Sequence, residues 1–476
     1  MNKNITNSKL FDAWNILSIT SVSNGAYLAI CNTLSNCQSK VVMKIYPEQN
    51  KRPFLYELKN LCYIKSLPYI VPIIDFGLCD GLYYIIMPYL GIDGKKYSLR
   101  EYIDNSPIDL QKNTVLLYRI LLNLCNIKKH YPNFVHGDIK AENFLFMDSL
   151  EQVFVADFGI SKIVNEPIEG LFFDSTYSYK APELWLDNKA YSEKSDIYAL
   201  GILMFELLLK RHPISNNRSL GAEEWCSLHQ KGLKSLEICN LSSELDSIIL
   251  SCLQKNPQNR PTLQQLTSSI SELLDSSTKG NIRFGFDTNA KMRFFADILI
   301  LSDDLAIKKL IPMGEAKMAY EIIRNKGIPI ETYNTHLALG IYYDEINDGN
   351  KSFEHLLCAM NKAISKDDLI WAINNIALIY KHADEYEISR TIFHDLLSLV
   401  SENDANNIIL NIALTYSDEG NYSKAILLLN NVLKMNPDNY LIWYNLFILY
   451  RRIGDKRNAK YAYARLKMIK SEFETS

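Results

Sequence analysis

Short apolar runs alternate with turn residues from position 15 to position 90, and one helical segment interrupts them. Such alternation is typical of strands, and it predicts a small, mostly antiparallel sheet. In the interrupting segment, Phe54, Leu58 and Leu61 recur at the spacing that places side chains on one face of a helix. Residues 110–129 form a longer, mainly apolar run, which predicts a second helix. The first half of the chain is therefore expected to be α+β.

The last third of the chain is helical by pattern and repeats itself. Residues 375–380 recur as residues 411–416 and again as residues 445–450, at spacings of 36 and 34, and residues 339–343 are a fainter copy. A period of this length is typical of stacked helix-turn-helix units. Each unit buries its small and aromatic positions only against its neighbours. We therefore predict an all-α repeat domain, a solenoid of helical hairpins.

Bulk composition narrows the classes of protein to which the chain can belong. With 476 residues, 47% of them hydrophobic and 22% charged, it is expected to form two or three globular domains. A formal net charge of -3 gives no overall attraction to nucleic acid or anionic lipid. Nine cysteines without a CxxC pair fit a reducing cytosol better than disulfides or a zinc site. No signal peptide or membrane span is apparent, so we expect a cytoplasmic protein.

The residue types with the most specific chemistry lie in two short motifs. Residues 136–143 read His-Gly-Asp-Ile-Lys-Ala-Glu-Asn, and an Asp-Phe-Gly triplet begins at Asp157. Asp138 can orient a hydroxyl group and accept its proton, while Asn143 and Asp157 offer oxygen ligands for Mg²⁺. Lys140 adds a positive charge close to Asp138. Phosphoryl transfer requires this combination, because the nucleophile must be oriented and the phosphate charge neutralised.

Together these motifs resemble the catalytic loop and the magnesium loop of eukaryotic-type serine/threonine protein kinases. The resemblance extends over about residues 14–275 and implies a two-lobed α+β fold with ATP in the cleft. It further implies that Asp138 is the catalytic base and that Lys140 bonds the γ-phosphate. Asn143 and Asp157 would hold Mg²⁺.

The segment that follows the magnesium loop also resembles the family. Residues 175–183 are similar to the pattern GTxxYxAPE, in which Thr176 would bond the catalytic aspartate and lysine. The resemblance implies a buried ion pair between Glu183 and Arg260, and it implies that Asp196 holds the backbone of the catalytic loop. These last three residues would be structural.

The resemblance also assigns residues to an ATP site in the first lobe. Gly25 is the only glycine kept of the three in the family's phosphate loop, and Ser23 and Leu28 replace the others. Lys44 lies in an apolar strand, where an unpaired ammonium would be costly, and Glu57 on the next helix would be its partner. Around adenine, the resemblance places Ile30, Val42, Met87 at the back of the pocket, the backbone of Pro88 and Leu90, and Leu145 beneath.

One departure from the family concerns regulation. Gly137 stands where most regulated kinases carry an arginine that pairs with a phosphorylated residue of the activation loop. A glycine cannot form that pair. We therefore predict activity that does not depend on phosphorylation of the activation loop, residues 160–180.

The repeats of the last third resemble tetratricopeptide repeats. In the last copy, the positions that fit the pattern are Trp443, Leu446, Tyr450, Ala459 and Tyr463. In earlier copies Ser352 and Ser389 replace a small alanine, which we expect to weaken the packing. By analogy with the family, the groove of such an array would hold a peptide or a protein. A cluster of basic residues in the last copy could meet an acidic partner, although a solvated face is the simpler explanation; it comprises Arg451, Arg452, Lys456, Arg457 and Lys460.

These patterns divide the chain into an N-terminal extension (1–13), a kinase domain (14–275), a polar linker (276–289), a helical cap or degenerate repeat (290–330) and the repeats (331–476). The expected function is a serine/threonine protein kinase that uses ATP and Mg²⁺, acts on a protein substrate and binds a partner through its repeats.

Two alternatives stay open. A pseudokinase scaffold would bind ATP and a partner protein without phosphoryl transfer, as the eroded phosphate loop and Gly137 suggest. Retention of the acidic and basic site residues, Lys44, Glu57, Asp138, Asn143 and Asp157, argues against it. A kinase-fold enzyme that acts on a small molecule is the second alternative, and the segment around Thr176 argues against that one.

Overall fold

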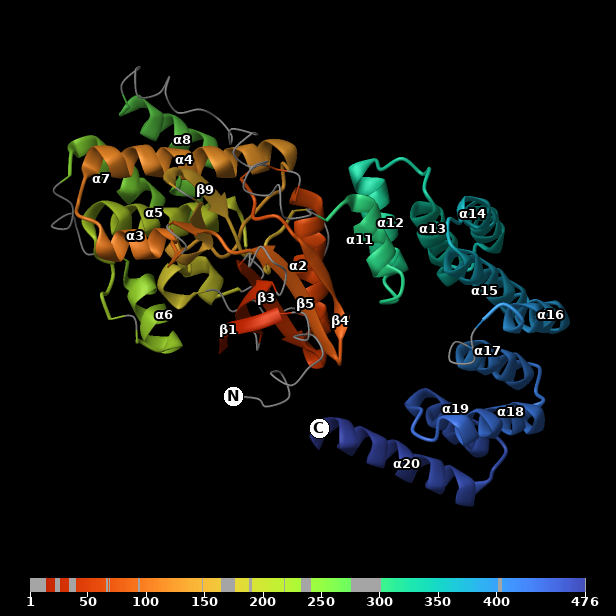
Figure 1. The fold of residues 1–476 in the computed structure, drawn as a ribbon. Helices are drawn as coiled ribbons and strands as arrows, with labels where there is room; N and C mark the ends of the chain where they lie inside the picture. The colour runs from red at the N-terminus through yellow and green to blue at the C-terminus, as the bar shows by residue number, and fades with distance from the viewer. Residues whose placement is uncertain are drawn as a thin grey trace. The chain divides into compact units, whose positions relative to one another are not determined.

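The computed structural model describes residues 14–21, 26–33, 40–65, 67, 69–92, 95–147, 149–163, 176–187, 191–217, 219–232, 241–274, 301–400 and 405–475. The chain divides into two compact units (Figure 1). One unit comprises residues 8–301 and the other consists mainly of residues 302–476. Among the described residues, no helix has both the length and the apolar composition needed to cross a bilayer.

The first unit begins with an antiparallel sheet of five strands in the order β1-β2-β3-β5-β4. The strands are β1 (Trp14–Ser21), β2 (Tyr27–Thr33), β3 (Lys40–Pro47), β4 (Asp75–Cys79) and β5 (Leu82–Pro88). Helix α2 (Lys51–Ile64) buries Phe54, Leu58 and Leu61, the face that the spacing predicted. The ring of Phe54 stacks on Tyr83 of β5, with 4.9 Å between ring centroids. The predicted sheet and its helix are therefore confirmed.

The rest of the first unit is mostly helical. Its helices are α3 (Leu99–Asn105), α4 (Leu110–His130), α5 (Glu193–Leu209), α6 (Ala222–Lys231), α7 (Ser243–Cys252) and α8 (Leu263–Glu272). Helix α5 is buried at every position from Ile197 to Leu208 and lies within this part of the unit (Figure 1). The buried residues are apolar around the helix except for Glu206, which pairs with Arg100 at 2.6 Å. Two short hairpins, β6 (Gly91–Ile92) with β7 (Lys95–Lys96) and β8 (Phe144–Met147) with β9 (Ser149–Val155), complete it.

The first unit ends at Leu301, which is hydrogen-bonded to the small lobe, the part of the unit formed by the five-stranded sheet and α2. Leu301 is 2% exposed, and its backbone N–H donates to the carbonyl of Ile73 at 3.1 Å. Its own carbonyl accepts a hydrogen bond of 2.7 Å from the ammonium of Lys65, which follows the end of α2. The described part of this unit thus includes a residue far beyond α8.

The second unit consists of helices in its described part. They are α11 (Asp303–Leu310), α12 (Ala316–Lys326), α13 (Tyr333–Glu345), α14 (Gly349–Lys362), α15 (Lys366–His382), α16 (Tyr386–Leu397), α17 (Ala405–Asp418), α18 (Tyr422–Met435), α19 (Tyr440–Arg452) and α20 (Lys456–Thr475). The three sequence copies at 375–380, 411–416 and 445–450 lie in α15, α17 and α19. The predicted all-α array of helical hairpins is therefore confirmed.

The serines that replace alanine in the repeats have hydrogen-bond partners. Ser352 is fully buried, and its hydroxyl donates to the carbonyl of Gly340 on the preceding helix at 2.7 Å. Ser389 makes the same bond to Ala377 at 2.8 Å. Because a buried hydroxyl is costly only when it lacks a partner, these bonds offset the polarity of the two serines.

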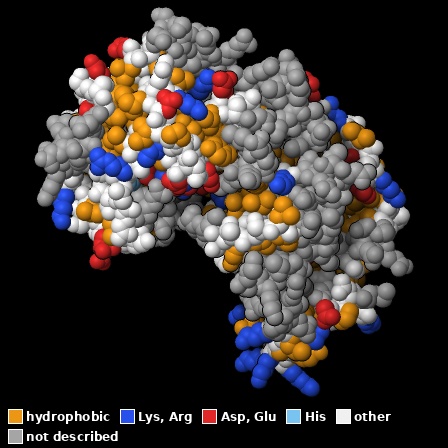
Figure 2. Space-filling model, turned by 60° about the vertical axis from the view of Figure 1, so that its left-hand side comes forward, with side chains coloured by type: hydrophobic (Ala, Val, Ile, Leu, Met, Phe, Trp, Pro, Cys, Tyr) orange, Lys and Arg blue, Asp and Glu red, His pale blue; other side chains and the backbone are white. Residues whose placement is uncertain are grey.

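Tyr463 departs from the expected repeat packing. It is 47% exposed, whereas Trp443, Leu446 and Ala459 of the same copy are buried. Tyr463 lies on α20, and its ring is 5.6 Å from that of Phe447 on α19, centroid to centroid. Figure 2 shows Lys and Arg side chains gathered beside hydrophobic ones at the lower edge of the view. Helix α20 begins at the lower edge of the molecule in Figure 1, from which Figure 2 is turned about the vertical axis.

Candidate active site

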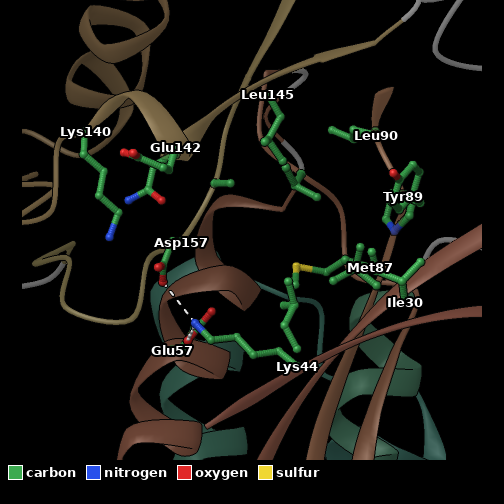
Figure 3. Close-up of a pocket in the computed structure, with 16 residues that line it drawn as sticks. Ile30, Lys44, Glu57, Met87, Tyr89, Leu90, Lys140, Glu142, Leu145 and Asp157 are labelled. Atoms are coloured by element: carbon green, nitrogen blue, oxygen red, sulfur yellow. Dashed lines mark hydrogen bonds and ion pairs between the residues drawn. The ribbon is translucent and has the colours of Figure 1, made fainter. Parts of the chain in front are cut away.

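A cavity of about 400 Å³ opens in the first unit between strands β2, β3 and β5 and the segments around β8 (Figure 3). Antiparallel pairing places Val42 opposite Met87 and Ile30 opposite Val42. The cavity brings together these predicted residues: Ile30, Val42, Lys44, Glu57, Met87, Pro88, Leu90, Lys140, Asn143, Leu145 and Asp157. Ser23 and Gly25, predicted for the phosphate loop, lie outside the described residues.

Apolar and charged groups occupy different ends of this cavity. In Figure 3, Met87, Leu90 and Leu145 lie toward one end, and Lys44, Glu57 and Asp157 meet toward the other. An apolar slot that ends in charged groups suits a ligand with a flat ring and an anionic tail.

Four further residues line the cavity that the sequence had not singled out, namely Val71, Tyr89, Glu142 and Ala156. Tyr89 and Ala156 are direct neighbours of predicted residues, so their proximity could have been inferred. Val71 had no such signal. A parallel bridge between Ile70 and Val155 brings it to the cavity.

Lys44 joins the small lobe to the magnesium loop. Its ammonium lies 2.7 Å from the carboxylate of Glu57 and 3.0 Å from that of Asp157. Burial alone would lower the pKa of Lys44, but the charges of Asp157 and Glu57 raise it well above its ordinary value. Burial alone would likewise raise the pKa of Asp157, but the charges of Lys44 and Lys140 hold it well below its usual range. Asp157 is therefore an ionised carboxylate near neutral pH.

Asp138 is held by three neighbouring side chains. Lys140 donates to one carboxylate oxygen at 2.5 Å, and the Thr176 hydroxyl donates to the other at 3.1 Å. Lys140 also donates to the Thr176 hydroxyl at 3.1 Å. The Asn143 amide nitrogen donates to the backbone carbonyl of Asp138 at 2.8 Å and to its carboxylate at 3.2 Å. These bonds fix the orientation of the carboxylate.

The backbone of the catalytic loop is held by hydrogen bonds to Asp196, as predicted. Asp196, in the first turn of α5, accepts hydrogen bonds from the backbone N–H of His136 at 2.6 Å and of Gly137 at 2.9 Å. Burial raises the pKa of Asp196 to about 7, although the two backbone donors oppose the rise. Gly137 has a φ of +83°, and a Cβ there would lie 3.0 Å from the carbonyl of Ile160. This backbone therefore favours glycine.

The predicted pair of Glu183 and Arg260 is also present. Two guanidinium nitrogens donate to the two carboxylate oxygens at 2.7 and 2.8 Å, and the Arg260 side chain is fully buried. This bidentate pair links the segment after Thr176 to the chain before α8.

The donor set at the charged end fits Mg²⁺. The ion prefers oxygen ligands, and the ionised carboxylate of Asp157 is one. Asn143 uses its amide nitrogen to bind Asp138, so its amide oxygen is the atom that could serve a cation. Lys44 and Lys140 supply positive charge near these ligands.

A two-lobed domain with a paired lysine and glutamate, a hydrogen-bonded aspartate and an Asp-Phe-Gly loop has the architecture of the protein kinase class. A family model described as "Protein kinase domain" matches residues 23–270, and the chain belongs to this family.

Named relatives agree with this assignment. A serine/threonine-protein kinase of Acanthamoeba polyphaga mimivirus is 32% identical over 247 residues, which is 48% of this chain and 84% of that protein. The calcium/calmodulin-dependent protein kinase cmkA of Emericella nidulans is 28% identical over 48% of this chain and 56% of its own length. Serine/threonine-protein kinase PrkC of Bacillus subtilis is 29% identical over 47% of this chain and 34% of its own length. The chain thus spans most of the first relative but about half or less of the other two.

Among solved structures, the Cydia pomonella granulovirus kinase PK-1 aligns with a TM-score of 0.45 at 23% identity. The alignment covers 56% of this chain and 97% of that one.

Proposed function

We propose that the chain transfers the γ-phosphate of ATP to a serine or threonine hydroxyl of a protein. The observation that carries the proposal is the arrangement around Asp138, whose carboxylate accepts hydrogen bonds from Lys140 and Thr176. Such bracing suits a residue that must present one oxygen to an incoming hydroxyl.

The proposal assigns a role to each of the site residues. Asp138 orients the substrate hydroxyl and takes up its proton. Lys140 and Lys44 hold phosphate oxygens. Mg²⁺, held by Asn143 and Asp157, would neutralise the charge of the phosphates.

The nucleotide base would occupy the apolar end of the cavity. Ile30, Val42 and Leu145 would contact its faces, and Met87 would limit the depth of the pocket. The carbonyl of Pro88 and the backbone of Leu90 would bond its edge. Ser23 and Gly25 remain the predicted residues of the phosphate loop.

The all-α unit is proposed to bind a peptide or a protein. Its support is the array of helical hairpins, which builds an extended surface in proteins of this architecture. The partner would bring a substrate or a regulator to the kinase unit.

The decisive experiment is transfer of labelled γ-phosphate from ATP in the presence of Mg²⁺, to the chain itself and to a generic basic protein. Wild-type protein is expected to label serine or threonine, and Asp138→Asn should reduce the rate about 100-fold or more. Asp80→Asn, on the exposed turn between β4 and β5, is the matched control and should keep the wild-type rate. Absence of label in wild type, with ATP still raising the melting temperature, would contradict the proposal and favour the scaffold.

A further inference from the structure

Helix α2 carries Glu57, and its position decides whether the ion pair with Lys44 can form. The same helix places a second polar side chain, Asn60, against the magnesium loop. The Asn60 amide nitrogen donates to the carbonyl of Phe158 at 2.9 Å and to the carbonyl of Ser161 at 2.7 Å. Asn60 is 3% exposed, so both of its N–H groups are used inside the protein.

Further bonds extend this contact in both directions. Tyr56, one turn before Asn60, donates its hydroxyl to the same Ser161 carbonyl at 2.9 Å. The hydroxyl of Ser161, which is fully buried, donates to the carbonyl of His136 at 2.7 Å. A chain of hydrogen bonds therefore runs from α2 through the magnesium loop to the catalytic loop.

Strand β3 holds the same helix from its other side. Tyr46, two residues after Lys44, donates its hydroxyl to Glu57, and Tyr46 is 2% exposed. Glu57 thus has two donors from one strand, the ammonium of Lys44 and the hydroxyl of Tyr46. A carboxylate with two fixed donors is restrained more strongly than one with a single mobile lysine.

We propose that Asn60 is a positioning residue which, with Tyr46, Tyr56 and Ser161, latches α2 to the magnesium loop without any phosphate. The inference rests on the proposed kinase activity. Regulated kinases use an arginine next to the catalytic aspartate to tie a phosphorylated loop to the site, and Gly137 has no side chain for that purpose. In this chain the latch supplies the tie instead, so Lys44 and Glu57 stay paired in unphosphorylated protein.

The test compares two buried asparagines. Asn60→Leu removes the donors of the latch. Asn113→Leu is the matched control, because Asn113 is fully buried, donates to the carbonyl of Leu207 at 2.9 Å and accepts from Tyr102 at 2.8 Å, away from the cavity. In full-length, unphosphorylated protein we would measure kcat, KM for ATP, and hydrogen–deuterium exchange of residues 51–64 and 157–163.

Asn60→Leu should lower kcat about tenfold or more, since small displacements of catalytic groups have effects of this size or larger. KM for ATP should change much less, and exchange should accelerate in both segments. Asn113→Leu should lower the melting temperature but leave the kcat of folded protein within about twofold of wild type. A kcat for Asn60→Leu no lower than that of Asn113→Leu would overturn the proposal.

Milder variants guard against loss of folding. Tyr46→Phe with Tyr56→Phe removes two hydroxyls and little volume, and Tyr102→Phe is the buried control. The double variant should lower kcat and speed exchange in α2, while the control should do neither. If wild-type protein transfers no phosphate, the proposed function has failed. Hydrogen–deuterium exchange alone then tests whether these residues hold α2 to the magnesium loop. Unchanged exchange in both sets of variants would overturn the proposed latch.

Discussion

The two units hold their buried polar groups in different ways. In the kinase unit, the bonds that shape the site join distant parts of the chain, 113 residues apart for Lys44 and Asp157 and 77 apart for Arg260 and Glu183. In the repeat unit, the recurring buried bond joins residues 12 apart, as between Ser389 and Ala377. Contacts between neighbouring repeats reach only a little farther, such as the 37 residues between Asn374 and Asn411.

This difference predicts how far the effect of a substitution extends within each unit. Removing one partner in the kinase unit disturbs a contact between segments that lie far apart in the chain. Removing one in the repeat unit disturbs a hairpin and its neighbours, because each repeat is stabilised by adjacent ones. Substitutions should therefore have larger effects in the first unit than in the second.

The largest effect on stability is expected for Glu183→Gln. The change leaves the guanidinium of Arg260, whose side chain is fully buried, without its anionic partner. Loss of one member of a buried pair costs about 3–5 kcal/mol. Calorimetry of the whole chain, with ADP added to identify the kinase transition, should show that transition shifted downward and the repeat transition unchanged. A shift of both transitions would contradict the comparison.

A second effect concerns the stability of the kinase unit at low pH. His229 is fully buried, and burial, reinforced by nearby His212, lowers its pKa to about 3. Its ring accepts a bond from Tyr198 at 2.9 Å and donates one to the carbonyl of Tyr177 at 3.0 Å, which requires the neutral form. The unfolded chain binds a proton below about pH 6.5, so stability should fall as the pH drops from there toward 3, by about 2 kcal/mol at pH 5.

Denaturant unfolding at pH 7.5 and pH 5 would measure this loss. His229→Gln should be less stable at pH 7.5 but should lose less between the two pH values than wild type does. An equal loss in both proteins would exclude His229 as the cause.

A smaller effect is expected within the repeats. Ser389→Ala removes one buried hydrogen bond and should cost about 1 kcal/mol. Only the repeat transition should move, and ATP binding should be unchanged. Ser398→Ala, on the exposed end of α16, is the control and should have no measurable effect. A change in kinase activity for Ser389→Ala would show that the effect of a substitution in the repeat unit reaches the kinase unit.

The smallest effect is expected for Glu419→Gln, the exposed counterpart of Glu183→Gln. Glu419 pairs with Arg390 at 2.8 Å, but its side chain is 40% exposed. Exposed pairs contribute about 0.5 kcal/mol, and less at high salt. Urea unfolding should give nearly the same free energy of unfolding for this variant as for wild type, at low and at high salt. A loss as large as that of Glu183→Gln would remove the contrast between buried and exposed pairs.

Much of the kinase unit could be predicted because its motifs fix both residue types and spacing. Lys44 with Glu57, Asp196 beneath His136, and Arg260 with Glu183 were all expected from the sequence, and the structure has each contact. The roles of the site residues in catalysis stay predictions until activity is measured.

Other features could not be predicted because they depend on packing. Asn60 reads as an ordinary polar residue of an amphipathic helix, and only the approach of the magnesium loop gives it two carbonyl partners. Val71 reaches the cavity through a strand bridge between segments far apart in sequence. From the sequence, Ser352 and Ser389 were expected to weaken the packing. Their hydrogen-bond acceptors lie on the preceding helix, and only the fold brings them close.

Leu301 sets a practical limit on how this protein can be shortened. The family match ends at residue 270, yet Leu301 provides the acceptor for Lys65 and a donor for Ile73. An expression boundary placed where the family match stops would remove both bonds, one next to the end of α2 and one just before β4. Screening or crystallisation of the isolated kinase unit should therefore retain the chain through residue 301.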